Sequence, residues 1–356
     1  MQQLPPLHIG IPFWEPNDGF GNVFLQTLRD LDVPAESFPH DAPIPPDCNA
    51  LLVYGPFGSL VPLANQLRHL PEASRPALLL FQTEQFPNPR WPEWARYTLS
   101  LSRSWVERLA YRSTTTPHSW LTRLIRKGHR FRYYGDLYWL RREGLLTLLI
   151  TDSYYTENFL RQRGFNPLLS SIGNHSDWGT DLGLERDIPV LWLGKPGSRR
   201  RARLLRQLRT ELQQRGVNLL MVDGIEHPYV FGHERTVLLN RSKITLNLLR
   251  QPWDDNSMRF YLAAVNGTLV VSEPMLPHSP FVDGQHLIVA PLAQLADTIC
   301  YYLEHEAERQ QLTNQARHFV LTELTMRNSM IHIIAELERK RPYQHQPPTK
   351  PQPGIT

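Results

Sequence analysis

Short apolar runs alternate along the chain with longer amphipathic segments. The apolar runs are rich in leucine and β-branched residues and are predicted to be strands, at 7–13, 50–55, 77–82, 145–153, 189–194, 217–224, 244–249, 268–272 and 286–291. Amphipathic segments such as 201–216 and 294–324 predict helices between most of them. Strands that alternate with helices are typical of parallel sheets covered by helices on both faces. The pattern therefore predicts an α/β protein.

Residues 244–273 indicate where such a protein would bind a ligand. A buried-type strand is followed by 254–257, Asp-Asp-Asn-Ser, which are residue types that begin helices. Gly267 then ends the predicted helix, directly before the next strand. The loop between strand and helix would lie at the carboxyl edge of a parallel sheet, where α/β proteins bind ligands.

The long polar segment near residues 166–188 predicts a boundary, because it is rich in Gly and Ser and has little periodicity. We predict two Rossmann-like domains whose parallel sheets face an interdomain cleft. The expected parts are an N-terminal domain (1–168), a linker (169–188), a second domain (189–340) and a tail (341–356). The tail is rich in Pro and Gln and is expected to be disordered.

Composition is that of a folded protein, with 41% hydrophobic and 20% charged residues among 356. No window reaches eighteen apolar residues, so no membrane span is expected. Cys48 and Cys300 are the only cysteines, which excludes a disulfide framework and a zinc site made of several cysteines. A cytoplasmic location is the default expectation. No pair of histidines has a metal-ligand spacing, and we predict no tightly held metal and no cofactor.

The net charge is +4, and the basic residues are concentrated between positions 103 and 142. Ten Lys and Arg lie in this segment, opposed only by Glu107 and Asp136, and aromatic residues are interleaved with them. One interpretation is a solvated helical surface with aromatic packing beneath it. The other is a patch that meets anionic lipid headgroups or an anionic acceptor. Nucleic acid is not a predicted partner, because no nucleic-acid-binding motif accompanies the charge.

Five landmarks follow one another in the second half of the chain, at 191–205, 235–248, 259–267, 281–289 and 301–312. Their order and spacing resemble those of GT-B glycosyltransferases, and in particular the group 1, spore-maturation-protein-like family. The resemblance implies transfer of a sugar from a nucleotide-sugar donor on the second domain to an unknown acceptor on the first. It also implies retention of the anomeric configuration, and a role in cell-envelope or polysaccharide glycosylation. The basic segment with its interleaved aromatic residues, and not the resemblance, is the ground for expecting an acceptor that is lipid-linked or at a membrane surface, with the protein peripheral to the inner membrane face.

The third landmark departs from the family pattern Arg-x-x-Glu-Ala-x-Ala-x-Gly, because Leu262 stands in place of the Glu. In related enzymes that carboxylate holds the ribose hydroxyls of the donor. A lost hydrogen bond to a charged group costs about 1.5–3 kcal/mol, so the activity is the less secure part of the resemblance. Two alternatives therefore stay open, namely a catalytically degenerate binding or scaffold protein and a nucleotide-sugar epimerase.

Candidate donor-binding residues follow the strands of the second domain, and several can neutralise a leaving diphosphate without a metal. They are Gly194, Lys195, Arg199, Arg201, Asn256, Arg259, Gly267 and Glu273. The resemblance aligns Arg201 with the family's arginine and makes it the preferred phosphate ligand. Asp254 is the predicted sugar-contacting carboxylate, unless it only caps the helix. The alternatives for the others are a basic turn capped by Ser198 and a surface ion pair at Arg259.

The first domain offers fewer candidates. Gly19, Gly21 and Asn22 follow the first strand and are expected on the acceptor side. Glu84, after the third predicted strand, is the best-placed acceptor-side base, although a loop ion pair is an alternative. Asp18 is a weaker candidate for that role, and His175, in the predicted linker, is a candidate contact for donor phosphate or sugar.

Overall fold

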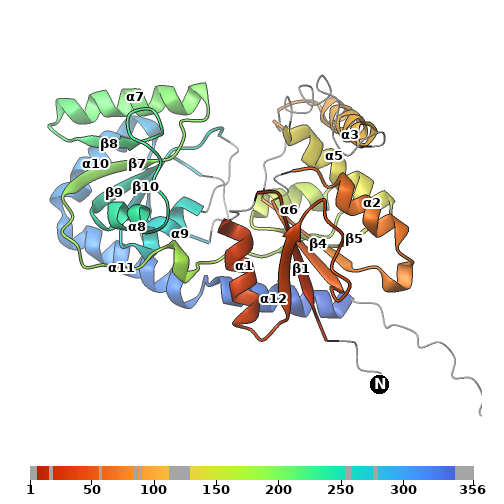
Figure 1. Cartoon of the computed structure of the whole chain (residues 1–356). Helices are drawn as coiled ribbons and strands as arrows, with labels where there is room; N and C mark the ends of the chain where they lie inside the picture. Colours follow the sequence, from red (N-terminus) through yellow and green to blue (C-terminus); the bar gives the residue numbers. More distant parts are fainter. Residues whose placement is uncertain are drawn as a thin grey trace, which may run out of the picture. The chain divides into compact units, whose positions relative to one another are not determined.

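The computed structural model describes residues 6–15, 19–55, 58–83, 87–88, 90–111, 129–252, 258–275 and 280–340. It contains two parallel sheets flanked by helices, which confirms the predicted α/β class (Figure 1). The chain divides into two compact units. One comprises residues up to Phe81, Ser100–Leu149 and residues from Ile333 onward, and the other comprises Gln82–Leu99 and Ile150–His332. The domain limits expected from the sequence stay a prediction.

The first sheet has six strands in the order β2-β1-β3-β4-β5-β6. The strands are β1 (Ile9–Phe13), β2 (Ala35–Pro39), β3 (Ala50–Tyr54), β4 (Ala77–Gln82), β5 (Leu146–Thr151) and β6 (Leu168–Leu169). The helices in this part of the chain are α1 (Gly19–Arg29), α2 (Val61–His69), α3 (Glu93–Ala110), α5 (His129–Arg142) and α6 (Tyr154–Arg161). β3 is buried at every position, as expected of a central strand covered on both faces.

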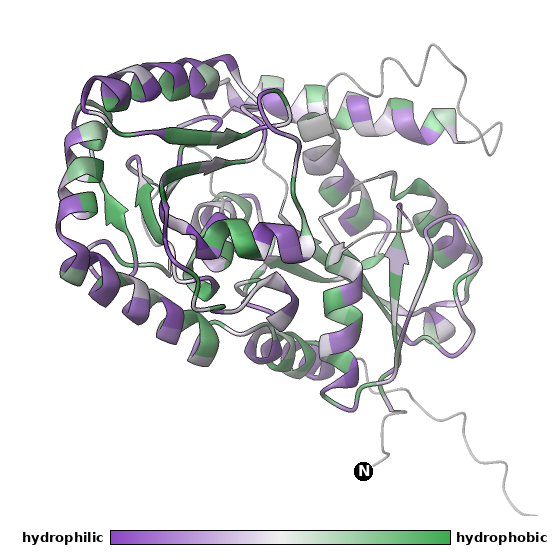
Figure 2. Cartoon of the chain, turned by 60° about the vertical axis from the view of Figure 1, so that its left-hand side comes forward, coloured by the Kyte–Doolittle hydropathy of each residue, from purple (hydrophilic) through white to green (hydrophobic). Residues whose placement is uncertain are grey.

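The second sheet has five strands in the order β11-β10-β9-β7-β8. They are β7 (Ile188–Leu193), β8 (Leu219–Val222), β9 (Ser242–Asn247), β10 (Leu269–Ser272) and β11 (Ile288–Val289). The helices in this part of the chain are α7 (Arg199–Gln214), α8 (Gly232–Asn240), α9 (Met258–Val265), α10 (Leu295–Glu304) and α11 (Glu306–Thr322). The last helix, α12 (Met326–Lys340), crosses the division between the units, because residues from Ile333 onward belong to the first one. The strands of the sheet are mostly green in Figure 2, whereas the helices alternate between purple and green.

Alternate residues of β7 explain why both faces of the second sheet are covered. Val190 and Trp192 pack on one face with leucines of α7 and α10. Leu191 points to the other face, where it packs with Leu239 of α8 and Leu262 of α9. This period of two places α9, and with it Leu262, over one face of the sheet.

Two short strands, β2 and β6, were not predicted from the sequence. β2 has the sequence AESFP and buries only Phe38, so it lacks the apolar run that identifies a strand. Its position at the edge of the sheet explains the polar composition. The predicted helix 294–324 is instead two helices, because His305 has φ −101° and ψ 69°, outside the helical region.

The predicted linker has ordered structure of its own. Its β6 residues pair with β5, and Trp178 packs on Tyr261 with ring centroids 5.9 Å apart. Gly179, with φ +142°, lies against Asn266, which donates a hydrogen bond to the Trp178 carbonyl. The residues that follow the first sheet are thus fastened to α9. The tail 341–356 lies outside the described residues.

The basic segment is not a uniformly charged surface in its described part. Arg103 is buried, and the Arg108 guanidinium stacks over Trp139 at 5.1 Å from the ring centroid. Tyr133 and Tyr134 are buried as well, whereas Trp105 is 55% exposed. Residues 112–128 lie outside the described part. Among the described helices, none combines the length and the apolar character that a bilayer crossing requires.

Candidate functional site

The loop after β7 is shaped by two glycines. Gly194 has φ +122° and Gly197 has φ +67°, which are backbone conformations that other residues rarely adopt. A Cβ at Gly197 would also lie 2.9 Å from an Arg201 nitrogen. Ser198 then caps α7, accepting a hydrogen bond from the Arg201 amide at 3.2 Å and donating one to the Arg250 carbonyl at 2.8 Å. The N-terminus of α7 therefore opens at the carboxyl edge of the sheet, where backbone N–H groups favour an anion.

A buried tryptophan lies beneath this loop. Trp192 is fully buried, and its indole N–H donates to the Gly194 carbonyl at 2.7 Å. The guanidinium of Arg259 lies 4.5 Å from the Trp192 ring centroid and that of Arg201 lies 5.2 Å from it. Cation–π attraction holds both guanidinium groups on one aromatic platform.

Arg201 is 3% exposed, and its guanidinium is engaged by the protein. It donates hydrogen bonds to the carbonyl oxygens of Pro196, Lys195 and Leu248. These contacts close the loop and tie it to the end of β9. The geometry gives Arg201 a positioning role, and direct phosphate binding by this residue stays a prediction.

Arg259, at the start of α9, is only partly buried and bonds to neutral oxygens. It donates to Asn247 Oδ1 at 2.9 Å and to the Leu193 carbonyl at 3.3 Å. Burial, followed by repulsion from Arg201 and Arg250, lowers its pKa to about 9. The guanidinium therefore stays protonated at neutral pH, and no carboxylate of the described residues is paired with it. A bound anion would relieve the repulsion among these arginines.

Glu273 is committed to a structural ion pair. It is 2% exposed and forms a two-pronged pair with Arg200. Its Oε1 also accepts from the Leu249 amide at 2.6 Å. Because both carboxylate oxygens are engaged, Glu273 is poorly suited to replace the carboxylate missing at Leu262.

A pocket of about 210 Å³ lies beside Arg259, over the face of the sheet covered by α8 and α9. It is lined by Leu193, Gly194, Tyr229, Val230, Phe231, Arg235, Leu239, Thr245, Met258, Arg259 and Leu262. Leu262 thus forms part of an apolar wall, with an arginine at its rim. Small-molecule sites commonly combine an apolar lining with a few convergent polar groups.

Arg235 is the second cation on this wall. Burial lowers its pKa, and its Nε has no hydrogen-bond partner within the described part of the chain. A buried donor without a partner is costly unless a ligand satisfies it. Arg235 could not be recognised from the sequence, because no motif surrounds it on α8. Trp192 could not be distinguished there from the other apolar residues of its strand.

Several predicted residues lie elsewhere or cannot be placed. Gly267, with φ +66°, follows α9 and precedes β10, so it lies at the amino edge of the sheet, away from the loop after β7. Its function there is to turn the chain, because a Cβ would lie 2.6 Å from an Arg186 nitrogen. The predicted residues that lie outside the described residues are Asp18, Glu84, Asp254 and Asn256.

The exposed cations of the loop have weaker contacts. Lys195 and Arg199 are exposed, and the Lys195 ammonium lies 5.5 Å from the Tyr229 ring centroid. In the first unit, Gly19, Gly21 and Asn22 form the first turn of α1, directly after β1, as the sequence predicts. Asn22 is exposed and Gly21 is buried there.

His175 has a structural contact of its own. It precedes the 3₁₀ turn Ser176–Trp178, is 9% exposed, and accepts from the Asp177 amide at 3.2 Å through Nδ1. This contact caps the turn, so His175 has a structural role that requires no ligand.

Comparison with known proteins finds a family match in the second half of the chain. Residues 199–335 match a family model described as glycosyl transferase-like. No curated protein sequence matches the chain. These residues include α7 and most of the pocket lining, with Arg235 and Arg259 among them, whereas Leu193 and Gly194 precede the matched part.

Solved structures with the same fold are GT-B glycosyltransferases. The sucrose-phosphate synthase from Thermosynechococcus elongatus has a TM-score of 0.57 and 12% identity, over 94% of this chain and 99% of that one. HepE from Anabaena, solved with UDP and glucose, has a TM-score of 0.56 and 11% identity, over 94% and 100%. TarM has a TM-score of 0.52 and 8% identity, covering 81% of this chain and 54% of its own. This chain thus spans little more than half the length of TarM, and at these identities the likeness establishes the fold.

Proposed function

We propose that this chain, which has a GT-B fold and whose residues 199–335 match a glycosyl transferase-like family model, transfers a sugar from a nucleotide-sugar donor to an acceptor. The donor binds on the second unit, with its nucleoside in the pocket of about 210 Å³. Its diphosphate lies beside Arg259 and the N-terminus of α7. Support comes from HepE, whose structures hold UDP, UDP with glucose, and UDP-glucose.

The observation that carries this proposal is the charge distribution at the pocket. Arg259 is held on Trp192 and on two neutral oxygens, so its positive charge is not neutralised by them. It stands next to Gly194, whose lack of a side chain lets a ligand approach the backbone closely. An apolar slot with a fixed cation at its rim suits a nucleoside that carries a diphosphate.

The catalytic contribution of these residues would be to stabilise the leaving diphosphate. As the sugar leaves, negative charge develops on the diphosphate, and Arg259 and the α7 amides stabilise it without a metal ion. Arg201 and Arg200 act indirectly, because the first holds the loop at Pro196 and the second holds Glu273. Positioning of an acceptor hydroxyl supplies the rest of the acceleration.

One residue of the donor site, Leu262, favours a second candidate function. In that case the chain is a binding or scaffold protein that retains the nucleotide site but does not transfer sugar. Leu262 lines the pocket where a ribose-binding carboxylate would be expected from the family resemblance. A leucine cannot accept a hydrogen bond from a hydroxyl. A binding protein would hold the nucleotide sugar without turnover, so the two functions differ in a single assay.

The acceptor is proposed to be lipid-linked or presented at a membrane surface, with the protein on the cytoplasmic side. Support comes from α3, where Trp94 and Trp105 are 73% and 55% exposed and lie three helical turns apart on one face. Tyr97 and Leu109 extend the same stripe and are 40% and 36% exposed. Exposed tryptophans on one face of a helix are typical of segments that lie in a membrane interface.

The test uses the full chain and a panel of nucleotide sugars. Calorimetry measures binding of each donor and of its nucleoside diphosphate, and product analysis measures donor hydrolysis and transfer. A transferase releases the nucleoside diphosphate and free or transferred sugar, whereas a binding protein retains the intact donor. If no nucleotide or nucleotide sugar binds, both functions are rejected.

A further inference from the structure

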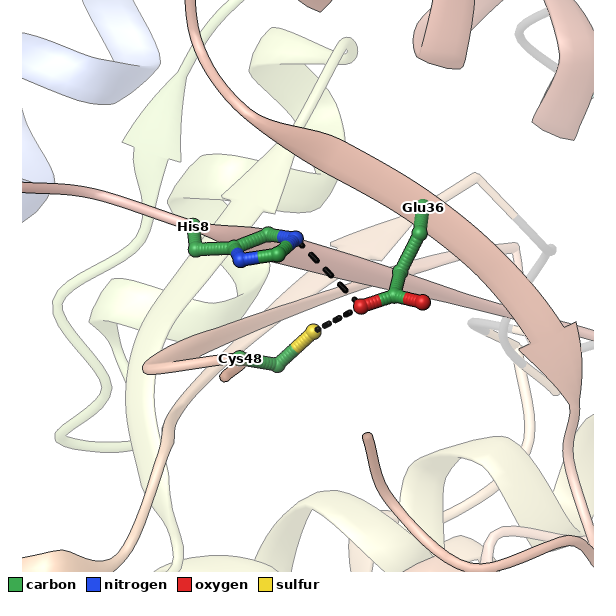
Figure 3. Close-up of side chains that lie close together, drawn as sticks. All are labelled: His8, Glu36 and Cys48. Atoms are coloured by element: carbon green, nitrogen blue, oxygen red, sulfur yellow. Dashed lines mark hydrogen bonds and ion pairs between the residues drawn. The ribbon is translucent and has the colours of Figure 1, made fainter. Parts of the chain in front are cut away.

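Three side chains with metal-ligating atoms converge at the amino edge of the first sheet (Figure 3). His8 directly precedes β1, Glu36 is the second residue of β2, and Cys48 lies two residues before β3. The strand register brings them together, since Ile9 pairs with Ala35 on one side and with Ala50 on the other. Ligands of α/β proteins bind at the opposite, carboxyl edge of a sheet, so this cluster is not part of the donor site.

The spacing of the three ligand atoms suits a tetrahedral ion. His8 Nε2 lies 3.3 Å from Glu36 Oε1, Cys48 Sγ lies 3.6 Å from the same oxygen, and all three atoms lie within 4.8 Å of one another. With zinc bonds of about 2.05 Å to N and O and about 2.3 Å to S, tetrahedral angles require N–O and S–O separations of about 3.3 and 3.5 Å. The N–O and S–O pairs already have nearly these separations.

The chemistry of the ligand set also points to zinc. A thiolate, an imidazole and a carboxylate together suit Zn²⁺, whereas Mg²⁺ and Ca²⁺ prefer oxygen ligands alone. Cys48 is buried, with its residue 5% exposed, while the His8 and Glu36 side chains are 25% and 44% exposed. A water molecule can therefore reach the fourth position, and an ion can enter from solvent.

The surrounding backbone holds the cluster in place. Asn49, next to Cys48, accepts a hydrogen bond from the His8 amide at 3.0 Å and donates one to the Pro6 carbonyl at 2.8 Å. Gly10 leaves room for the sulfur, because a Cβ there would lie 3.0 Å from Cys48 Sγ. Burial and the neighbouring Glu36 raise the pKa of the Cys48 thiol to about 12, which makes it an unreactive thiol when no cation is bound.

We propose that His8, Glu36 and Cys48 form a zinc site that fastens the edge strand β2 to β1 and β3. Zinc replaces the thiol proton of Cys48, which is released to water, and bonds to the sulfur, to His8 Nε2 and to a Glu36 oxygen. The site is structural and independent of the nucleotide site. It was not visible in the sequence, because its ligands lie at or just before the starts of three separate strands and have no local spacing.

Cobalt titration of the metal-free, reduced, full-length protein tests the site, because Co²⁺ substitutes for zinc and absorbs light. The expected result is one equivalent of Co²⁺ bound with a thiolate charge-transfer band and tetrahedral visible bands, all bleached by Zn²⁺. Cys48→Ser abolishes the charge-transfer band, whereas the matched control Cys300→Ser retains it, since Cys300 is the other free cysteine. Glu36→Gln and His8→Gln weaken Zn²⁺ binding at least about tenfold, because each removes one of three ligands.

A thermal melt adds a second readout. Zinc is expected to raise the melting temperature of the wild type and of Cys300→Ser, but not that of Cys48→Ser or Glu36→Gln. Glu36→Gln keeps the shape of an exposed side chain, so it remains informative if Cys48→Ser does not fold. The proposal is overturned if the wild type shows no one-to-one thiolate band, or if the band survives in Cys48→Ser. In either case the three residues form a hydrogen-bonded triad only.

Discussion

Replacing Arg259 with methionine should weaken nucleotide binding while leaving the fold almost equally stable. The variant removes a cation whose pKa is lowered to about 9 by burial and, to a smaller extent, by repulsion from Arg201 and Arg250. A shift of that size corresponds to about 5 kcal/mol at most, and the partial exposure of Arg259 reduces it to about 1–2 kcal/mol. Against this gain, the buried Asn247 oxygen loses its donor, at a cost of about 1–3 kcal/mol. The two effects nearly cancel.

Ligand binding has no such compensation. A charge-assisted hydrogen bond to phosphate is worth about 1.5–3 kcal/mol, so Arg259→Met should raise the dissociation constant of a nucleoside diphosphate roughly 10- to 150-fold. The affinity for the nucleoside alone should stay within about twofold, because the apolar slot is unchanged. Calorimetry with both ligands measures the difference, and urea unfolding checks stability. Arg206→Met is the matched control, since Arg206 is exposed further along α7.

Arg259 does not bind the diphosphate if Arg259→Met binds the nucleoside diphosphate as tightly as the wild type. The same conclusion follows if nucleoside and nucleoside diphosphate lose affinity by the same factor. The second result would mean that Arg259 supports the pocket and does not contact the phosphates.

Three further substitutions test other parts of the site. Leu262→Glu should raise the preference for a ribonucleoside diphosphate over its 2′,3′-dideoxy form about tenfold or more. The preference is measured as the ratio of the two dissociation constants, and Leu262→Gln is the control. An unchanged ratio would mean that the ribose does not lie beside residue 262. Ser198→Ala should cost about 1 kcal/mol of unfolding free energy and weaken diphosphate binding, whereas Ser153→Ala, which removes the cap of α6, should cost the same without affecting binding. Glu273→Gln should destabilise the protein by about 3 kcal/mol in urea unfolding, because the Arg200 charge loses its buried partner. Asp187→Asn, in an exposed pair with Arg241, should cost far less stability than Glu273→Gln, and equal losses would contradict the assignment.

The sequence predicted the buried strands well because their apolar runs report burial on both faces. Nine predicted runs correspond to strands, whereas β2, with one buried side chain in five, gave no such signal. Residue types alone could not show which arginine side chain is hydrogen-bonded to backbone carbonyl oxygens and which can bind a ligand. Arg201 and Arg259 lie on the same tryptophan, yet the first is engaged by three carbonyl oxygens and the second is not. That difference depends on backbone positions that become defined only in the folded chain.

The arginines around the donor site differ in their hydrogen-bond partners, and this difference leaves positive charge available in the pocket. Arg200 has a buried carboxylate, and Arg201 has backbone carbonyls, so each is already stabilised by the protein. Arg259 and Arg235 line the pocket with pKa values lowered by burial, and within the described residues neither is bonded to a carboxylate. Placing cations in such surroundings destabilises the unliganded protein, and a dianionic ligand reverses that cost. The proposed donor site therefore derives its affinity for a nucleoside diphosphate from charges that the fold leaves uncompensated, with Leu262 keeping the pocket wall between them apolar.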